Sequence, residues 1–229
     1  MRINKYIAKS GLTSRRKAEN YIKEGKVRVN GNLLKDLSYK VKKDDKVSVC
    51  GKNLEIEDKF YYKLNKPIGF ISSNYDPYNK KDLNDLIDID KRFFCAGRLD
   101  KDSHGLMLIT NDGEISNKLI HPSKEIQKVY IVKTDKEMNK KDIDKFSKSI
   151  KLSNTEKTSN AKIESIGKNI YRVTIHQGFN RQIRRMFAYF GIKVIDLLRI
   201  KIGDISLGSL ENGQYKKLSD KELAFLKNL

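Results

Sequence analysis

Residues 97–113 read Gly-Arg-Leu-Asp-Lys-Asp-Ser-His-Gly-Leu-Met-Leu-Ile-Thr-Asn-Asp-Gly. Residues 105–110 form a continuous apolar run, which is the pattern of a strand buried on both faces. A turn signal at 111–113 follows, and a helix is expected near 114–121. The first half of the stretch is polar and leads into the strand. Asp100 is therefore predicted at the mouth of a loop held by a rigid sheet, where catalytic groups often lie.

Strand patterns recur on both sides of this stretch. Tyr171, Val173 and Ile175 alternate with other residues at the period of two that a strand requires. Further strands are expected over 60–64, 126–133, 161–166, 170–176 and 193–202. Many strands with few helices between them predict an α+β fold built on a mixed, mainly antiparallel sheet.

The first fifty residues show a different pattern, in which two helices precede a strand. The expected elements are a helix over 3–10 that ends at Gly11, a second helix from Thr13 or Ser14 to Gly25, a strand over 27–29, a tight turn at Asn30-Gly31, and a return strand over 47–49. We therefore expect a small module over residues 1–52, a linker over 53–59, and a second domain over 60–229.

Positive charge is concentrated in this small module. The 229 residues carry 48 Lys and Arg against 29 Asp and Glu, a net charge of +19, and the pI is about 9.7. Residues 1–53 hold 15 basic and 5 acidic residues, or +10. This excess favours a polyanion such as nucleic acid, with binding that weakens steeply as salt rises. A compositional bias toward Lys and Asn is the alternative.

The sequence lacks the residues that are characteristic of several other classes of protein. No apolar run approaches the ~18 residues of a membrane span, and charges occupy the first positions, where a signal peptide is apolar. Cys50 and Cys95 cannot form a disulfide framework, so a reduced, cytoplasmic location is expected. Phosphate-loop and dinucleotide motifs do not occur. Residues 100–111 begin like a calcium loop, but Asn111 cannot supply the bidentate carboxylate.

Basic residues in the module stand where phosphate groups can be bound. Residues 14–17 lie at a predicted helix start, and Lys26 and Arg28 share the outer face of a strand. A solvated, Lys-rich surface is the alternative. The whole pattern resembles the S4 RNA-binding domain over nearly all of residues 1–50. This resemblance implies RNA contacts from Arg2, Lys5, Ser14, Arg15, Arg16, Lys26, Arg28 and Asn30.

Asp100 taken singly fits a turn residue as well as a catalytic one. Asp102 lies two residues on, so the paired-carboxylate chemistry of a retaining glycosidase is also conceivable. Residues 97–106, however, resemble the motif Gly-Arg-Leu-Asp-x-x-(Ser/Thr)-x-Gly-Leu of the RsuA/RluB/RluE/RluF family of pseudouridine synthases. The resemblance spans almost the entire chain and implies that Asp100 is the catalytic residue.

Two further motifs support the same resemblance. Residues 128–130 match the family's Lys-x-Tyr, which implies that Tyr130 stacks on the target base, although a tyrosine in a strand usually packs. Residues 182–186 match its Gln-(Ile/Val)-Arg-Arg-Met on a predicted helix, where Arg184 lies at the border of the apolar face. The resemblance implies that Arg184 is the ion-pair partner of Asp100.

Asn180 and Arg181 favour the RluF-like branch, which modifies large-subunit (23S) ribosomal RNA, because small-subunit members usually carry Tyr-His there. The further RNA contacts implied are Arg98, Lys128, Asn180, Arg181 and Arg185. The reaction adds no group and oxidises nothing, so we expect no cofactor and no metal. The expected protein is a monomer acting on ribosomal RNA, free or within a subunit precursor. The alternatives are a small-subunit (16S) enzyme and a non-catalytic S4-domain RNA-binding protein.

Overall fold

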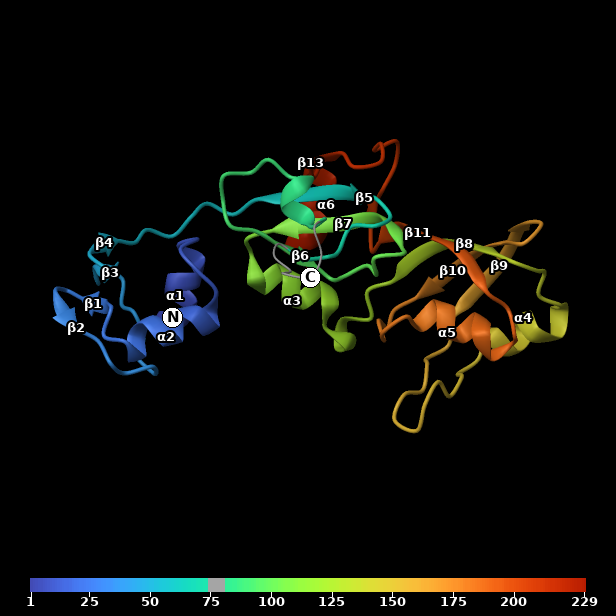
Figure 1. The fold of residues 1–229 in the computed structure, drawn as a ribbon, viewed down its shortest axis with the longest axis horizontal. Coiled ribbons are helices and arrows are strands. Elements are labelled where there is room, and N and C mark those ends of the chain that lie inside the picture. Colours follow the sequence, from blue (N-terminus) through green and yellow to red (C-terminus); the bar gives the residue numbers. More distant parts are fainter. Residues whose placement is uncertain (74–80) are drawn as a thin grey trace. The chain divides into compact units, whose positions relative to one another are not determined.

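The computed structural model describes residues 1–73 and 81–229, and the chain divides into two compact units (Figure 1). The first unit comprises Met1–Phe60 and Ile89–Phe93, and the second comprises Tyr61–Asp88 and Phe94–Leu229. None of the helices in the described part of the chain is long and apolar enough to cross a membrane.

The first unit combines two helices with a small antiparallel sheet of order β2-β1-β3-β4. Its elements are α1 (Ile3–Lys9), α2 (Arg15–Lys23), β1 (Val27–Val29), β2 (Asn32–Leu33), β3 (Val47–Val49) and β4 (Lys52–Asn53). The helices pack on each other, and their buried Ile3, Ile7, Ala18 and Ile22 meet the valines of β1 and β3 in one core. This core fixes the helix-helix-strand order that the sequence predicts.

Two details of this unit differ from the expectation. The strand that returns across the Asn30-Gly31 turn is β2, whereas β3 pairs with the other side of β1. The chain then turns again at Cys50 and Gly51, with φ of 51° and 80°, so that β4 forms inside the stretch read as the start of a linker. A cysteine is an uncommon residue in this left-handed conformation, which is why the turn gave no signal.

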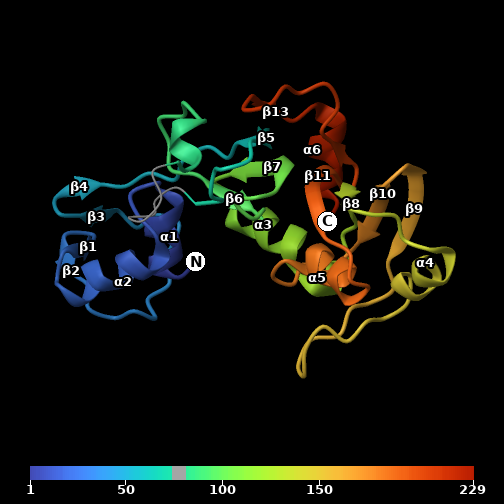
Figure 2. The ribbon, with the colours of Figure 1, turned by 45° about the vertical axis from the view of Figure 1, so that its right-hand side comes forward.

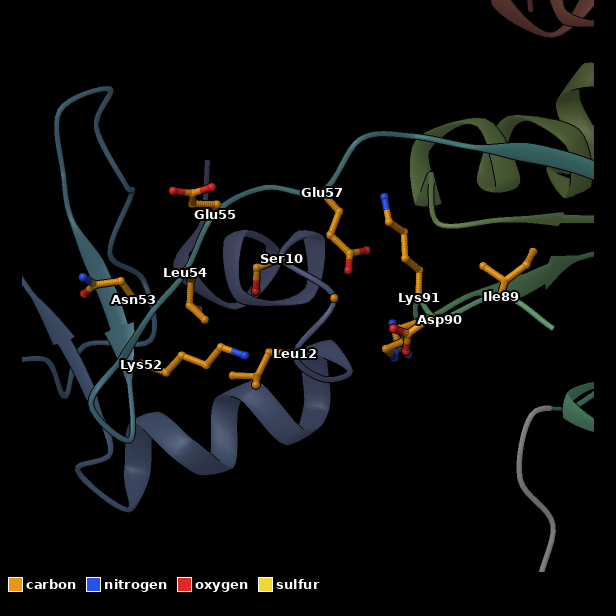
Figure 3. Close-up of a pocket in the computed structure, with 12 residues that line it drawn as sticks. Ser10, Leu12, Lys52, Asn53, Leu54, Glu55, Glu57, Ile89, Asp90 and Lys91 are labelled. Carbon is orange, nitrogen blue, oxygen red and sulfur yellow. The ribbon is translucent and has the colours of Figure 1, made fainter. Parts of the chain in front are cut away.

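The first unit also contains a pocket of about 620 Å³ (Figure 3). It is lined by residues 10–12, 52–55, Glu57 and 89–92. The side chain of Glu57 occupies the space beside Gly11 that a Cβ atom would fill. Acidic and basic side chains alternate around the wall, so the pocket selects neither anions nor cations, and we assign it no ligand.

The second unit is built on a nine-stranded sheet, whose main path is β13-β5-β7-β11-β8-β10-β9 (Figure 1). Its strands are β5 (Tyr61–Lys66), β6 (Phe94–Ala96), β7 (His104–Thr110), β8 (Lys128–Thr134), β9 (Lys162–Gly167), β10 (Ile170–Ile175), β11 (Val194–Ile202), β12 (Ile205–Ser206) and β13 (Tyr215–Lys217). Among the strand pairs of the described residues, β7–β11 alone is parallel. The mixed, mainly antiparallel sheet is confirmed.

Helices cover this sheet in two groups. They are α3 (Gly113–Ile120), α4 (Lys140–Phe146), α5 (Gln182–Tyr189) and α6 (Asp220–Lys227), with short 3-10 turns η1 (Leu83–Asp85) and η2 (Pro122–Lys124). Residues of α3 and α6 share a core with β7 and β11. Phe187 of α5 joins Phe146 of α4 and Tyr171 of β10, with ring centroids 4.8 and 5.7 Å apart. Figure 2 shows α5 beside the β8–β10–β9 part of the sheet.

Five elements of this unit were not predicted: β6, β12, β13, α4 and α6, the last despite the Ser219–Glu222 capping box at its start. The strands β6 and β13 are three residues long, and α4 is mostly charged. Helix α6 is fastened by a buried ion pair, in which Lys63 Nζ of β5 lies 2.5 Å from Glu222 Oε1. A buried Lys–Glu pair reads as surface in a hydrophobic pattern, so the packing of α6 on β5 stays hidden in the sequence.

Candidate active site

Asp100 lies in the loop that joins β6 to β7, and the backbone of this loop is fixed on both sides of it. Ser72 Oγ accepts a hydrogen bond from the Leu99 N–H at 2.9 Å and donates one to the Leu99 carbonyl at 2.6 Å. On the other side, the Gly69 N–H donates to the Lys101 carbonyl at 2.7 Å. The segment that follows β5 therefore holds the residues before and after Asp100.

A buried lysine shapes this holding segment. Lys66 is fully buried, and its ammonium donates to the carbonyls of Pro67 and Phe70 at 2.9 and 2.7 Å. Burial lowers the pKa of Lys66 to about 8, the charges of Asp100 and Asp102 oppose this change, and Arg199 adds to it. The lysine thus lies in the field of the loop carboxylates. In the sequence, Lys66 indicated only the turn at Lys66-Pro67.

Asp102 attaches the same loop to α5. Arg181 Nη1 and Nη2 donate to the two carboxylate oxygens of Asp102 at 2.9 and 2.7 Å, a bidentate pair. Arg184 Nη2 donates to the Asp102 carbonyl at 2.7 Å, and its Nε lies 3.4 Å from the carboxylate. Hydrogen bonds from Arg181, reinforced by the charge of Arg184, hold the pKa of Asp102 below its usual value.

The arginine beside Asp100 differs from the one that the motif implied. Arg184 contacts Asp102 in place of Asp100, and it is Arg181 Nη1 that lies 4.0 Å from Asp100 Oδ2. The reason is local: Arg181 precedes α5 in the left-handed conformation, with φ of 48°. Helical spacing, which pointed Arg181 to solvent, does not apply to it, and its side chain extends toward the loop.

Arg199 is a buried charge that the sequence reasoning missed. It lies on β11, opposite Tyr130 of β8 and Gly105 of β7, and is 2% exposed. Its Nε donates to the Leu106 carbonyl at 2.7 Å and its Nη1 to the Arg98 carbonyl at 3.4 Å. Nη2 is buried without a hydrogen-bond partner among the described residues. The available signal was an arginine flanked by apolar residues, Leu197, Leu198 and Ile200, in a predicted strand.

Gly105 allows β7 to lie this close to Arg199. Its φ is 104°, and an added Cβ atom would collide with the backbone N and O of Arg199. Any other residue would force β7 away from β11 at the point where the loop ends. The glycine of the motif is therefore required by the parallel strand pairing.

Tyr130 and Lys128 lie two residues apart on β8, so their side chains share one face of the sheet. Tyr130 is 7% exposed. The Lys128 ammonium donates to the carbonyls of His176 and Ile126 at 2.9 and 3.2 Å. Burial, with Arg199 nearby, lowers the pKa of Lys128 to about 8. The Lys128 ammonium is thus held by two carbonyl oxygens of its own unit.

The other expected RNA-binding residues of this unit divide by their contacts. Arg185 is engaged by the protein, since it pairs with Glu156 at 2.7 Å and donates to the Leu152 and Asn180 carbonyls. Arg98, Asn180 and Arg181 are exposed. The structure therefore brings Asp100, Arg181 and Arg184 to one loop and leaves Arg185 outside it.

In the first unit, four of the residues expected to contact RNA also contact other residues of the protein. Ser14 caps α2 by accepting from the Lys17 N–H at 3.2 Å. Asn30 bonds Asp45 and the Lys46 N–H, both at 2.9 Å. The remaining partners are Glu24 for Lys26, at 2.6 Å, and the Gly31 carbonyl for Arg28, at 2.9 Å. Arg2, Arg15 and Arg16 are exposed.

The second unit thus presents two carboxylates on a fixed loop, of which Asp102 is held by a bidentate pair with Arg181 and Asp100 is not. The side chain of Asp100 is 34% exposed, so a substrate can reach it. A basic helix-helix-strand unit precedes this site in the chain. An accessible carboxylate on a fixed loop, in a chain that also carries a basic helix-helix-strand unit, suits an enzyme that acts on RNA.

Comparison with known proteins specifies the class. Residues 61–189 match the family described as RNA pseudouridylate synthase, and residues 1–47 match the S4 domain. The chain is 41% identical to the ribosomal large subunit pseudouridine synthase B of Bacillus subtilis, over 100% of this chain and 96% of that protein. It is 38% identical to the dual-specificity RNA pseudouridine synthase RluF of Escherichia coli K12, over 97% and 77%.

A solved structure agrees with this relationship. The crystal structure of a pseudouridylate synthase superposes with a TM-score of 0.74 at 33% identity, covering 99% of both chains. The chain belongs to the RNA pseudouridylate synthase family, with an S4 domain at its N-terminal end.

Proposed function

We propose that this protein isomerises a specific uridine of large-subunit ribosomal RNA to pseudouridine, with Asp100 as the catalytic residue. The supporting observation is the fixed loop, in which Ser72 and Gly69 hold the residues on either side of an accessible Asp100 carboxylate. Similarity over the full chain to a large-subunit enzyme supports the choice of RNA.

The reaction is an isomerisation. The N1–C1′ bond of the uridine breaks, the base turns, and C5 bonds to C1′; the C5 hydrogen leaves as a proton and N1 gains a proton. Asp100 acts as a carboxylate in this sequence, either by attack on a carbon or by removal of a ribose proton. Positive charge from Arg181 at 4.0 Å stabilises the carboxylate before the uridine arrives.

The uridine must leave its base stack to reach Asp100, at a cost of a few kcal/mol. Tyr130 supplies a flat face against which the base turns, and Arg98 on the same loop enters the space that the base leaves. The exposed Arg2, Arg15 and Arg16 of the S4 domain, together with Lys5, bind phosphates of the surrounding RNA. The enzyme works as a monomer on free RNA or on a subunit precursor.

Release of the C5 hydrogen gives a direct test. Ribosomal RNA from cells that lack this gene, labelled with tritium at C5 of uridine, should release tritium to water when the purified protein is added. Mapping of pseudouridine in both ribosomal RNAs, with and without the gene, should show one lost large-subunit site. Loss of a small-subunit site would overturn the choice of RNA. Binding without tritium release from any ribosomal RNA would leave the non-catalytic S4 protein.

The hold on Leu99 predicts a positioning role for Ser72. Ser72→Ala removes both hydrogen bonds to Leu99 and frees the residue before Asp100, so kcat should fall about tenfold while KM stays within twofold, because a small misplacement of a reacting group is costly. Steady-state tritium release measures both constants. Ser165→Ala, on exposed β9, is the matched control. A KM change with constant kcat would contradict the positioning role.

A further inference from the structure

A second pocket lies beside the catalytic loop, within the second unit. It has a volume of about 670 Å³ and is lined by Asp102, Arg181, Arg184, Ala188 and residues 191–195. We propose that this pocket binds a nucleotide of the substrate RNA that neighbours the target uridine. The inference rests on the proposed function, which supplies the RNA, and it names a subsite that the catalytic motif does not contain.

The charge of the pocket suits a phosphate. Three cations line it, Arg181, Arg184 and Lys193, against one anion, Asp102. The Asp102 carboxylate is already engaged by the bidentate pair with Arg181. Arg181 uses two of its five N–H groups in this pair, and its side chain is 44% exposed. Lys193 is exposed. The uncompensated charge on this wall is positive, which favours a phosphate ligand.

The apolar part of the lining suits a base. The register between β11 and β8 shifts between Val194 and Asp196, so that Ile195 is the extra residue of a bulge. Bulges re-aim side chains and occur next to active sites. Here the bulge turns Ile195 outward, where it is 53% exposed. An apolar side chain beside a lysine and an arginine matches a ligand with a flat apolar part and an anionic part, which is a nucleotide.

The position of the pocket defines which nucleotide it takes. Arg181 lines the pocket and also lies 4.0 Å from Asp100, so one guanidinium borders both sites. When a uridine is held at Asp100, the nucleotide that reaches this pocket is one or two positions away from it on the same RNA strand. A pocket for a neighbouring nucleotide must adjoin Asp100, because the two nucleotides are covalently linked. A pocket for a protein partner could lie anywhere on the surface.

The test uses the full-length protein and a naked RNA fragment that contains the uridine identified by mapping. Lys193→Ala and Ile195→Ser should each raise KM about tenfold and leave kcat within twofold, because stacking and phosphate contacts contribute to binding away from the reacting bond. Lys216→Ala, on β13, and Ile166→Ser, on β9, are the matched controls, and both positions are exposed on the outer strands of the sheet.

Shortened RNA supplies a second, independent readout. RNA fragments shortened on the 5′ or the 3′ side of the target uridine should be compared. Shortening on the side that enters the pocket should raise KM for the wild type, and on that RNA Lys193→Ala should raise KM no further. Unchanged KM for both variants would overturn the subsite. A KM effect on ribosomal particles that is absent on naked RNA would overturn it in favour of a protein partner.

The two proposals fail in different ways. If the wild type releases no tritium from any ribosomal RNA, the proposed function fails, and the pocket is then judged by the dissociation constants of the wild type and the variants for unfragmented ribosomal RNA. If the wild type is active and the variants match it, the subsite alone fails.

Discussion

Asp100→Asn should abolish pseudouridine formation, with kcat reduced at least about 1,000-fold, while the protein still binds its RNA. The substitution keeps the shape of the side chain and removes its charge. The amide can neither attack a carbon nor accept a proton, so both chemical routes stop. The fold should be unaffected, because Asp100 is 34% exposed and its nearest cation, Arg181, also pairs with Asp102.

Tritium release and RNA binding must be measured on the same preparation of this variant. The dissociation constant should stay equal or fall, since a negative charge next to the phosphate backbone is removed. Asp204→Asn, in the exposed turn between β11 and β12, is the matched control and should keep full activity. Turnover within tenfold of the wild type for Asp100→Asn would refute the catalytic assignment.

The two loop carboxylates have different roles, which answers the open question of paired-carboxylate chemistry. Asp102 binds Arg181 through both oxygens and has a lowered pKa, so it is committed to holding α5 against the loop. Asp100 keeps an accessible carboxylate. A glycosidase pair requires two carboxyl groups that both face the substrate. This difference in ion pairing supports the proposal that Asp100 is the reactive carboxylate of the loop.

The sequence predicted the strands well because burial dictates them. Residues 105–110 are buried along their whole length, as their apolar run indicated, and β10 alternates with the period of two. The glycine of the motif around Asp100 has a steric reason: a side chain at Gly105 would collide with the Arg199 backbone. Features that depend on one strand or one spacing are thus readable from the chain.

Contacts between distant segments were not readable in the same way. Ser72 looked like one of several loop serines until the fold placed it on Leu99. Arg181 was expected to contact RNA, and its approach to Asp100 could not be predicted because a left-handed residue before α5 does not follow the helical spacing. The motif on α5 marked the correct neighbourhood, but the pairing of Arg184 with Asp102 is set by tertiary packing.

Arg199→Met should reduce kcat by about 100- to 1,000-fold, the cost of losing a fixed charge at a reacting centre. Arg199 places its guanidinium under the loop through the Arg98 carbonyl and leaves Nη2 without a partner among the described residues. A buried arginine with an unused donor is expensive to keep. Methionine fills a similar volume without charge, so the melting temperature should stay within a few degrees while activity falls.

A purely structural role would give the opposite result, with stability and activity lost together. Arg199→Lys separates the two, because it keeps the charge and loses the forked geometry. The kcat of Arg199→Lys should be about tenfold higher than that of Arg199→Met. Arg172→Met, on β10 and exposed, should behave as the wild type. Equal activity of the Lys and Met variants would show that Arg199 supports the loop without contributing its charge. The signature of an electrostatic role is therefore the rescue by lysine at unchanged melting temperature.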